Sequence, residues 1–211
     1  NPHIKVIGVE PSGPRCIKTS LEKGEVVTLP HVNTIADGTA VQTPGEHIFP
    51  YLQENLDDVI TIDDDELIVA FLDMVENHKM IVENSGLLTV AALRHLNFTG
   101  KKVVSILSGG NMDVITMSSV VQHGLIQRDR IFTVSVLIPD KPGELVRVAS
   151  IIAENQGNVI KLDHNQFIST NRYAAVELKV TLEAYGTDHK KKIVKALEEA
   201  GCKPKIIRAN L

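Results

Sequence analysis

A polar segment, residues 122–130 (QHGLIQRDR), divides the chain into two stretches whose hydrophobic patterns differ. Before it, strand-like runs alternate with helix-like runs, which is typical of an α/β layer with largely parallel strands. After it, the order of the expected elements is βαββαβ. We therefore predict an N-terminal unit over residues 1–121, a linker over 122–130 and a C-terminal unit over 131–211.

In the first stretch, three strands are expected, at residues 4–10 (IKVIGVE), 58–62 (DVITI) and 101–107 (KKVVSIL). Between the last two, the spacing of Asp63 and Glu66 predicts a capping box for a helix over 63–77. The acidic run DDDE is then a helix start with carboxylates favoured by the helix dipole, in preference to a metal site.

A second helix is expected over residues 81–97, where Asn84 or Ser85 can cap its first turn. Glu83 then lies where a strand passes into a helix. In open α/β sheets ligands bind at that edge, so Glu83 is a candidate site residue, although a solvated loop residue fits equally well.

The second stretch predicts a ferredoxin-like unit, with two helices on one face of a four-stranded antiparallel sheet. Alternation places the apolar residues of 131–139 and 172–183 on one face of their strands, and helices are expected over 143–157 and 188–201, with Gly157 and Gly201 following their ends. Small units of this size commonly pair, so we expect a dimer through it.

Composition excludes several classes of function. The net charge of −4 and pI near 6.1 argue against nucleic acid as a partner. No apolar run approaches the roughly 20 residues that span a bilayer, and the N-terminus lacks a signal-peptide layout. Cys16 and Cys202 are far apart and the eight histidines lack ligand spacing, so neither disulfides nor zinc are expected and a cytoplasmic location fits best. Because the chain begins at Asn1 and enters a strand at once, we expect it to be a piece of a longer protein.

Four strings then occur in a familiar order: VIGVEP (6–11), TIADG (34–38), VENSG (82–86) and LSGGNMD (107–113). With them, the chain resembles the C-terminal portion of serine/threonine dehydratases, which are fold-type II enzymes of tryptophan synthase β-like fold that depend on pyridoxal 5'-phosphate. Residues 131–211 are similar to the ACT regulatory domain of many threonine ammonia-lyases.

This resemblance implies a cofactor site. The hydroxyl of Ser108 would hydrogen-bond the pyridine nitrogen, Gly109 and its neighbour Gly110 would let the backbone come close, and Gly38 and Glu83 would line the pocket. A neutral hydroxyl holds the ring without protonating it, which suits β-elimination better than transamination. A glycine-rich structural turn is the alternative interpretation of SGGN.

The resemblance also implies an effector site in the second unit, for an amino acid such as isoleucine or valine, across a dimer interface. Its residues would be Pro142, Gly143, Leu145, Asn158 and Val159. The DKPG turn exposes backbone N–H groups suited to a carboxylate, although a purely structural turn remains an alternative. Tetramers are expected if both units form dimers.

The chain itself supplies no catalytic residue by this resemblance, because the family's Schiff-base lysine and glycine-rich phosphate loop are not in it. We predict that the intact enzyme converts L-threonine to 2-oxobutanoate and ammonia, and that the 211-residue chain alone is inactive. Other interpretations remain open: L-serine as the substrate, a racemase relative, or a catalytically silent amino-acid-binding subunit. A nucleotide-binding oxidoreductase is disfavoured because no G-x-G-x-x-G follows a strand.

Glu10 matches a carboxylate that binds a divalent cation in some relatives. In this chain Cys16 stands where those relatives have an aspartate. We therefore expect Glu10 to be structural and predict no metal.

Overall fold

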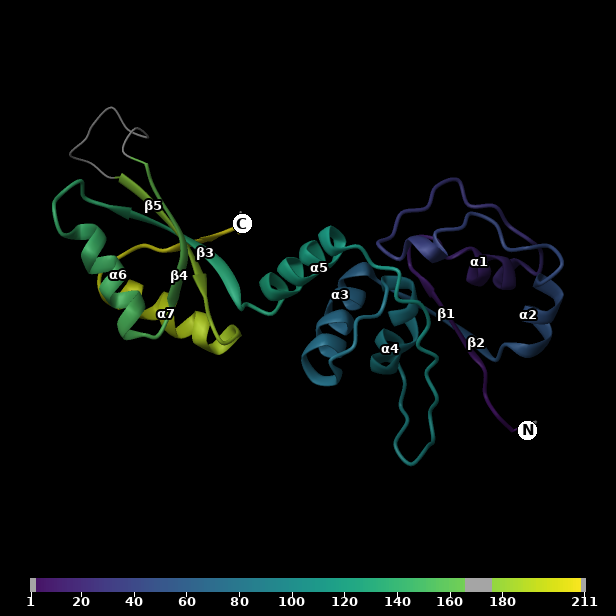
Figure 1. Ribbon diagram of the computed structural model, residues 1–211. Helices are drawn as coiled ribbons and strands as arrows, with labels where there is room; N and C mark the ends of the chain where they lie inside the picture. Colours follow the sequence, from purple (N-terminus) through teal and green to yellow (C-terminus); the bar gives the residue numbers. More distant parts are fainter. Residues whose placement is uncertain (1–2, 166–175, 210–211) are drawn as a thin grey trace. The chain divides into compact units, whose positions relative to one another are not determined.

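The computed structural model (Figure 1) describes residues 3–165 and 176–209. The chain divides into two compact units, residues 1–124 and 125–211. The division falls inside helix α5 (Val114–Gln127), so most of the expected linker is helical. Gly124, which looked like a linker residue, is buried, and a side chain there would lie 2.5 Å from Leu72 Cδ1. The glycine thus serves close packing rather than a break in the helix.

The first unit combines a two-stranded parallel sheet with short helices. Its strands and α-helices are β1 (Ile7–Pro11), α1 (Cys16–Lys23), α2 (Phe49–Asn55), β2 (Asp58–Ile62), α3 (Asp64–Asp73) and α4 (Leu88–Ala91). β1 pairs with β2 from Ile7↔Asp58 to Pro11↔Ile62. The strand predicted at 58–62 is therefore confirmed, and the one predicted at 4–10 is confirmed from Ile7 onward, with parallel pairing.

The strand predicted at residues 101–107 is wrong, because this segment is a loop. Its apolar side chains lie largely in solvent: Val104 is 88% exposed and Ile106 is 71% exposed. A strand needs a neighbour to pair with. Here the Lys101 N–H donates to the Phe98 carbonyl within a turn, and the hydrogen bonds of Thr89 Oγ1 to the Ile106 carbonyl and of Ser105 Oγ to the Thr89 carbonyl join the segment to a helix. The β-branched pattern was right for a strand, but the described residues offer it no partner strand.

Helix α3 begins as predicted. Asp63 and Glu66 form the capping box, in which the Asp63 N–H donates to Glu66 Oε2 at 3.1 Å. The predicted apolar face is buried at Leu67, Phe71 and Met74, and a π-helical turn (Met74–His78) continues the helix. This face forms the centre of the first unit's core.

The second predicted helix is irregular. It consists of a 3-10 turn (Asn84–Leu87), α4 and a second 3-10 turn (Ala92–His95). Neither Asn84 nor Ser85 caps it, because Glu83 is the N-cap residue and Asn84 lies inside the first turn, where its side chain bonds to another segment. The expected cap residues therefore serve tertiary contacts.

The second unit has the predicted βαββαβ order. Its elements are β3 (Ile131–Ile138), α6 (Glu144–Glu154), β4 (Asn158–Asn165), β5 (Val176–Glu183), α7 (Thr187–Glu199) and β6 (Lys205–Ile207). The sheet order is β4-β5-β3-β6 with every pairing antiparallel, which matches the ferredoxin-like arrangement.

The core of this unit lies between one face of the sheet and both helices. The predicted inward residues of β3 and β5 are all buried: Phe132, Val134, Val136, Ile138, Val176, Leu178, Val180 and Leu182. Val148 and Ile152 of α6 and Ile193 and Leu197 of α7 pack against them. The sheet's other face is polar, as the hydrogen bond between Thr133 and Thr181 at 2.9 Å shows.

The two helix stops differ. Gly201 has a φ of 80° just past α7, as predicted. After α6, by contrast, the left-handed residue is Gln156, with a φ of 63°, and not Gly157. Gly157 is needed for packing instead, because a side chain there would lie 2.8 Å from Ile152 Cγ2 and 3.0 Å from Ile193 Cδ1. Among the described residues, no helix combines the length and hydropathy that crossing a bilayer requires.

Candidate functional site

Three segments of the first unit converge at one place: residues 34–38, 83–86 and 107–111. Each approach depends on a glycine. A side chain on Gly38 would lie 2.9 Å from Ser85 Oγ, one on Gly86 would overlap the carbonyl of Ser108, and one on Gly109 would overlap the carboxyl group of Glu83. The structure therefore brings together all four residues predicted to bind the cofactor, with 83–86 in the middle.

Glu83 shapes the turn at residues 109–111. Its Oε2 accepts a hydrogen bond from the Asn111 N–H at 3.1 Å, and its own N–H donates to the Gly109 carbonyl at 3.4 Å. Gly109 has a φ of 77°, a conformation that favours glycine. The carboxylate thus holds the SGGN segment in a left-handed turn.

Ser108 and both glycines of the predicted site lie at the surface of the described chain. At the far end of this segment, Asp113 accepts hydrogen bonds from the N–H groups of Ile115 and Thr116, at 2.9 and 3.0 Å. Hydrogen bonds from Thr116 lower the pKa of Asp113 and favour its charged form. The loop carrying Ser108 is therefore fixed at one end by Glu83 and at the other by the start of α5.

The segment TIADG is held by two residues whose role the sequence did not indicate. Asp64 accepts hydrogen bonds from Thr34 Oγ1 at 2.6 Å and from the Ile35 N–H at 3.0 Å. Asn84 Nδ2 donates to the Ile35 carbonyl at 3.0 Å. The sequence pattern indicates Asp64 only as part of a helix start and Asn84 only as a possible cap. It does not show their contacts with Ile35, which lies 29 residues from Asp64 and 49 residues from Asn84.

Two polar atoms in the central segment are buried without a hydrogen-bond partner within the part of the chain that the structure describes. They are Asn84 Oδ1 and Ser85 Oγ, and Asn84 as a whole is 4% exposed. Buried polar groups are normally paired, and an unpaired one costs about 1–3 kcal/mol. Within the described chain, these two atoms are therefore unsatisfied hydrogen-bonding groups in the segment between the two predicted cofactor loops.

Glu10 has a structural contact, as expected. Its carboxylate, 7% exposed, accepts hydrogen bonds from the N–H groups of Ile17 at 3.1 Å and Lys18 at 2.8 Å, at the start of α1. Burial raises its pKa, and burial followed by the charge of Glu10 raises the pKa of the Cys16 thiol. Among the described residues, no group of three or more His, Cys, Asp or Glu side chains could hold a metal ion.

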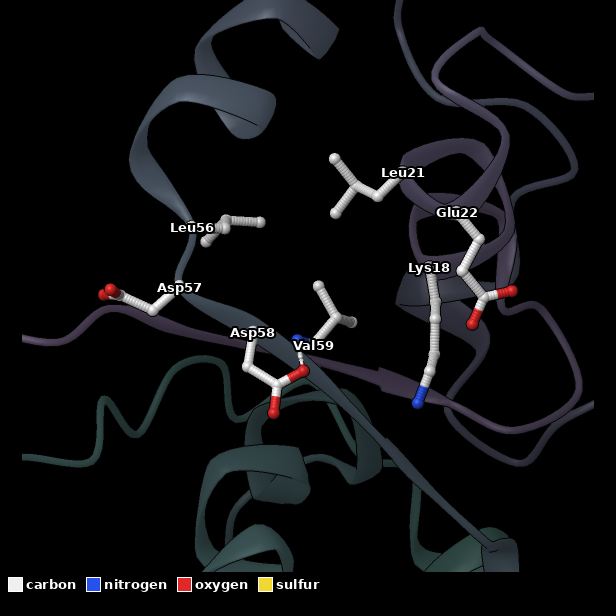
Figure 2. A pocket seen from close by; sticks show the side chains of 7 residues that line it. All are labelled: Lys18, Leu21, Glu22, Leu56, Asp57, Asp58 and Val59. Atoms are coloured by element: carbon white, nitrogen blue, oxygen red, sulfur yellow. Dashed lines mark hydrogen bonds between the residues drawn. The ribbon is translucent and has the colours of Figure 1, made fainter.

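A surface cavity of about 320 Å³ lies elsewhere in the first unit (Figure 2). Lys18 and Glu22 of α1 border it on one side, and residues 56–59 border it on the other. The two aspartates that line it bind the backbone, because Asp57 Oδ2 accepts from the Val6 N–H and Asp58 Oδ1 from the Val59 N–H, both at 2.7 Å. None of the predicted site residues lines this cavity.

The predicted effector residues lie in two groups. Pro142, Gly143 and Leu145 surround the start of α6, where Gly143 has a φ of 94°. Asn158 and Val159 begin β4, beyond the other end of the helix, and Asn158 Nδ2 donates to Glu183 Oε2 at 3.2 Å. The 11 residues of α6 correspond to roughly 16 Å, so the fold does not bring the two groups together within one chain.

Comparison with known proteins gives consistent results for the first unit. Residues 1–109 match the model of the family described as pyridoxal-phosphate dependent enzymes. An L-threonine ammonia-lyase of Geobacter sulfurreducens is 34% identical over 203 residues, which cover 95% of this chain and 50% of that protein. The chain thus spans about half the length of the curated relatives that it matches.

Two solved structures of enzymes also align with part of this chain. The processed form of threonine deaminase isoform 2 from Solanum lycopersicum aligns with a TM-score of 0.53 and 33% identity, over 58% of this chain and 37% of that one. Maize serine racemase aligns with a TM-score of 0.52 and 34% identity, over 58% of this chain and 41% of that one.

Proposed function

The chain belongs to the family of pyridoxal-phosphate dependent enzymes, and from this premise we propose that the intact protein is a threonine ammonia-lyase, converting L-threonine to 2-oxobutanoate and ammonia. The names of the relatives support this reaction. The observation that carries the proposal is the convergence of Gly38, Glu83, Ser108 and Gly109, which a single segment, residues 83–86, holds together.

The residues present fit the cofactor. Residues 83–86 lie against both Gly38 and Gly109, and this segment contains two buried polar atoms without partners in the described chain. Ser108 would hold the pyridine nitrogen, with Glu83 and Gly38 lining the pocket. Pyridoxal phosphate, when bound, supplies the electron sink for loss of the α-proton.

The proposed contribution of this chain is to hold and orient the cofactor. Glu83 fixes the turn that presents Ser108, and the Ser108 hydroxyl, being neutral, positions the ring without giving it a proton. The family's lysine and phosphate loop are not among these 211 residues. We therefore propose that the chain alone does not deaminate threonine.

For the second unit we propose an ACT domain that binds an amino acid such as isoleucine or valine between two copies. β4 is an edge strand of eight residues without proline, and its Val159, Ile160 and Leu162 are 38%, 47% and 38% exposed. Such an edge is prone to pair with a second chain.

The strand register explains why a dimer would complete the effector site. Asn158 pairs with Glu183, whereas Ile138, which precedes the DKPG turn, pairs with Val176. Seven residues of β5 separate these positions, roughly 23 Å. Antiparallel pairing of β4 with its symmetry copy would place Asn158 of one chain at the end of the sheet that carries the partner's DKPG turn.

The test is threonine deamination by the full-length protein, followed as 2-oxobutanoate, with and without isoleucine or valine. We expect 2-oxo acid formation that one of these amino acids changes. Replacing Ser108 by Ala should weaken cofactor binding and lower turnover by about tenfold or more, whereas Ser150→Ala, on the exposed side of α6, should change neither. Formation of D-serine from L-serine without 2-oxo acid would instead favour a racemase, the activity named for the maize relative.

A further inference from the structure

The segment between the two cofactor-facing loops contains polar atoms that the proposed roles do not use. Asn84 Oδ1 and Ser85 Oγ are buried and lack a partner in the described chain. Asn84 Nδ2, by contrast, donates a hydrogen bond to the Ile35 carbonyl at 3.0 Å. This bond fixes the orientation of the Asn84 side chain and leaves Oδ1 without a partner among the described residues. The orientation is therefore determined by the fold and does not result from free rotation.

Ser85 lies among the residues assigned to the cofactor. Its hydroxyl occupies the space next to Gly38, at 2.9 Å from where a side chain of residue 38 would begin. Two other residues of the same segment face the other loop, because Glu83 lies against Gly109 and Gly86 lies against the Ser108 carbonyl. A ligand held by Gly38, Glu83 and Ser108 is thus the nearest candidate to supply the missing partner.

We propose that Ser85 is an additional positioning residue for pyridoxal phosphate. Its hydroxyl can donate or accept, so it can bind a polar edge of the cofactor or an ordered water that comes with it. The inference rests on the proposed cofactor site and adds Ser85 to it.

This role makes a prediction that a structural serine does not. In the described chain the hydroxyl is buried and unpaired, which is unfavourable, and removing such a group does not destabilise a fold. In the protein with cofactor, removing it loses a hydrogen bond. Ser85→Ala should therefore weaken cofactor binding while leaving the melting temperature of the cofactor-free protein unchanged or higher.

The experiment uses the full-length protein, freed of cofactor by dialysis against a competing amine, then titrated with pyridoxal 5'-phosphate and followed by absorbance. We expect Ser85→Ala to raise the dissociation constant about tenfold, with no fall in the melting temperature of the cofactor-free protein. Ser150→Ala serves as the matched control and should match wild type in both measurements.

Three results would overturn the inference, and they are distinguishable. A wild-type dissociation constant for Ser85→Ala means that Ser85 does not contact the cofactor. Weaker binding together with a melting temperature several degrees lower without cofactor means that Ser85 is structural. If the wild-type full-length protein itself shows no binding of pyridoxal phosphate, the proposed function fails, and this inference fails with it.

Discussion

Glu83 and Gly109 are in contact in such a way that the carboxyl group of the first fills the space where a side chain of the second would be. The backbone joins them as well, through the Glu83 N–H and the Gly109 carbonyl at 3.4 Å. The pair links the start of residues 83–86 to the loop of residues 107–111, because Gly109 follows Glu83 by 26 residues. It thereby determines the position of Ser108. The geometry of the proposed cofactor site therefore depends on the absence of a side chain at position 109.

Replacing Gly109 by Ala should disrupt this arrangement. Alanine at a φ of 77° costs about 1–2 kcal/mol in backbone energy, and its methyl group would also displace Glu83. We expect the affinity of the full-length protein for pyridoxal phosphate to fall by about tenfold or more. Gly24→Ala is the matched control, because Gly24 has a φ of 75° with open space around it and lies outside the proposed site; equal effects of the two substitutions on cofactor affinity would contradict the assignment.

Glu10 should make stability depend on pH in a direction unusual for a carboxylate. Burial raises its pKa above the ordinary value of 4.5 in the folded chain. A raised pKa means that the folded state holds the proton more tightly, so its contribution to stability is full below pH 4.5 and is lost as the pH rises through the folded pKa. We expect wild type to lose stability relative to Glu10→Gln as the pH is raised above 4.5, measured by urea unfolding.

The control for that measurement is Glu22→Gln, on the exposed side of α1. The loss on raising the pH should be specific to position 10, where the carboxylate is buried. If Glu10→Gln gives the same profile as Glu22→Gln, or if wild type gains on Glu10→Gln as the pH rises, the hydrogen bonds from Ile17 and Lys18 dominate over burial and the prediction is wrong.

The second unit could be predicted almost completely from the sequence, because each of its central strands and helices has one buried face, which the spacing of apolar residues indicates. The inward residues of β3 and β5 and the stop at Gly201 are where the pattern indicated. The interpretation of Gly157 was wrong for an instructive reason. A glycine after a helix can serve the backbone or the packing, and only the position of Ile193, 36 residues later, decides between them.

The first unit was harder to predict, since its order depends on contacts that are distant in sequence. The capping box at Asp63 is local and was found. The segment 101–107 has the composition of a strand but needs a neighbour, and the described chain does not provide one. Likewise, the four candidate site residues rest on the resemblance, whereas Asp64 and Asn84, which hold TIADG in place, act through three-dimensional contacts that no local motif shows.

The ion pair between Asp129 and Lys190 should stabilise the second unit measurably. Lys190 Nζ lies 2.6 Å from Asp129 Oδ1, Thr187 Oγ1 donates to Oδ2 at 2.8 Å, and both charged side chains are less than a quarter exposed. Asp129 has a φ of 55°, which asparagine tolerates, so Asp129→Asn removes the charge without straining the backbone. We expect a loss of about 1–2 kcal/mol at pH 7.

The same substitution predicts a pH dependence. The hydrogen bond from Lys190 lowers the pKa of Asp129 below its ordinary 3.8, so its contribution is present above pH 3.8 and is lost as the pH falls through the folded pKa. The difference between wild type and Asp129→Asn should therefore shrink on acidification. Lys195→Met is the control, since its pair with Glu199 is 3.4 Å long, both side chains are more than two-thirds exposed, and the pair should contribute under about 0.5 kcal/mol; an equal effect there would contradict the prediction.

Substitutions at two leucines can distinguish the dimer that we propose from other modes of association. Leu162 lies on the edge strand β4 and is 38% exposed, whereas Leu137 lies on the central strand β3 and is 55% exposed, on the face away from the helices. A lysine at an edge strand opposes pairing with a second chain. We expect Leu162→Lys to shift the protein toward smaller assemblies in analytical ultracentrifugation and to remove the response to the effector amino acid. Leu137→Lys should do neither, because it leaves the edge intact; dissociation by Leu137→Lys alone would show that copies associate through the open face of the sheet, and the effector residues would then have to be assigned anew.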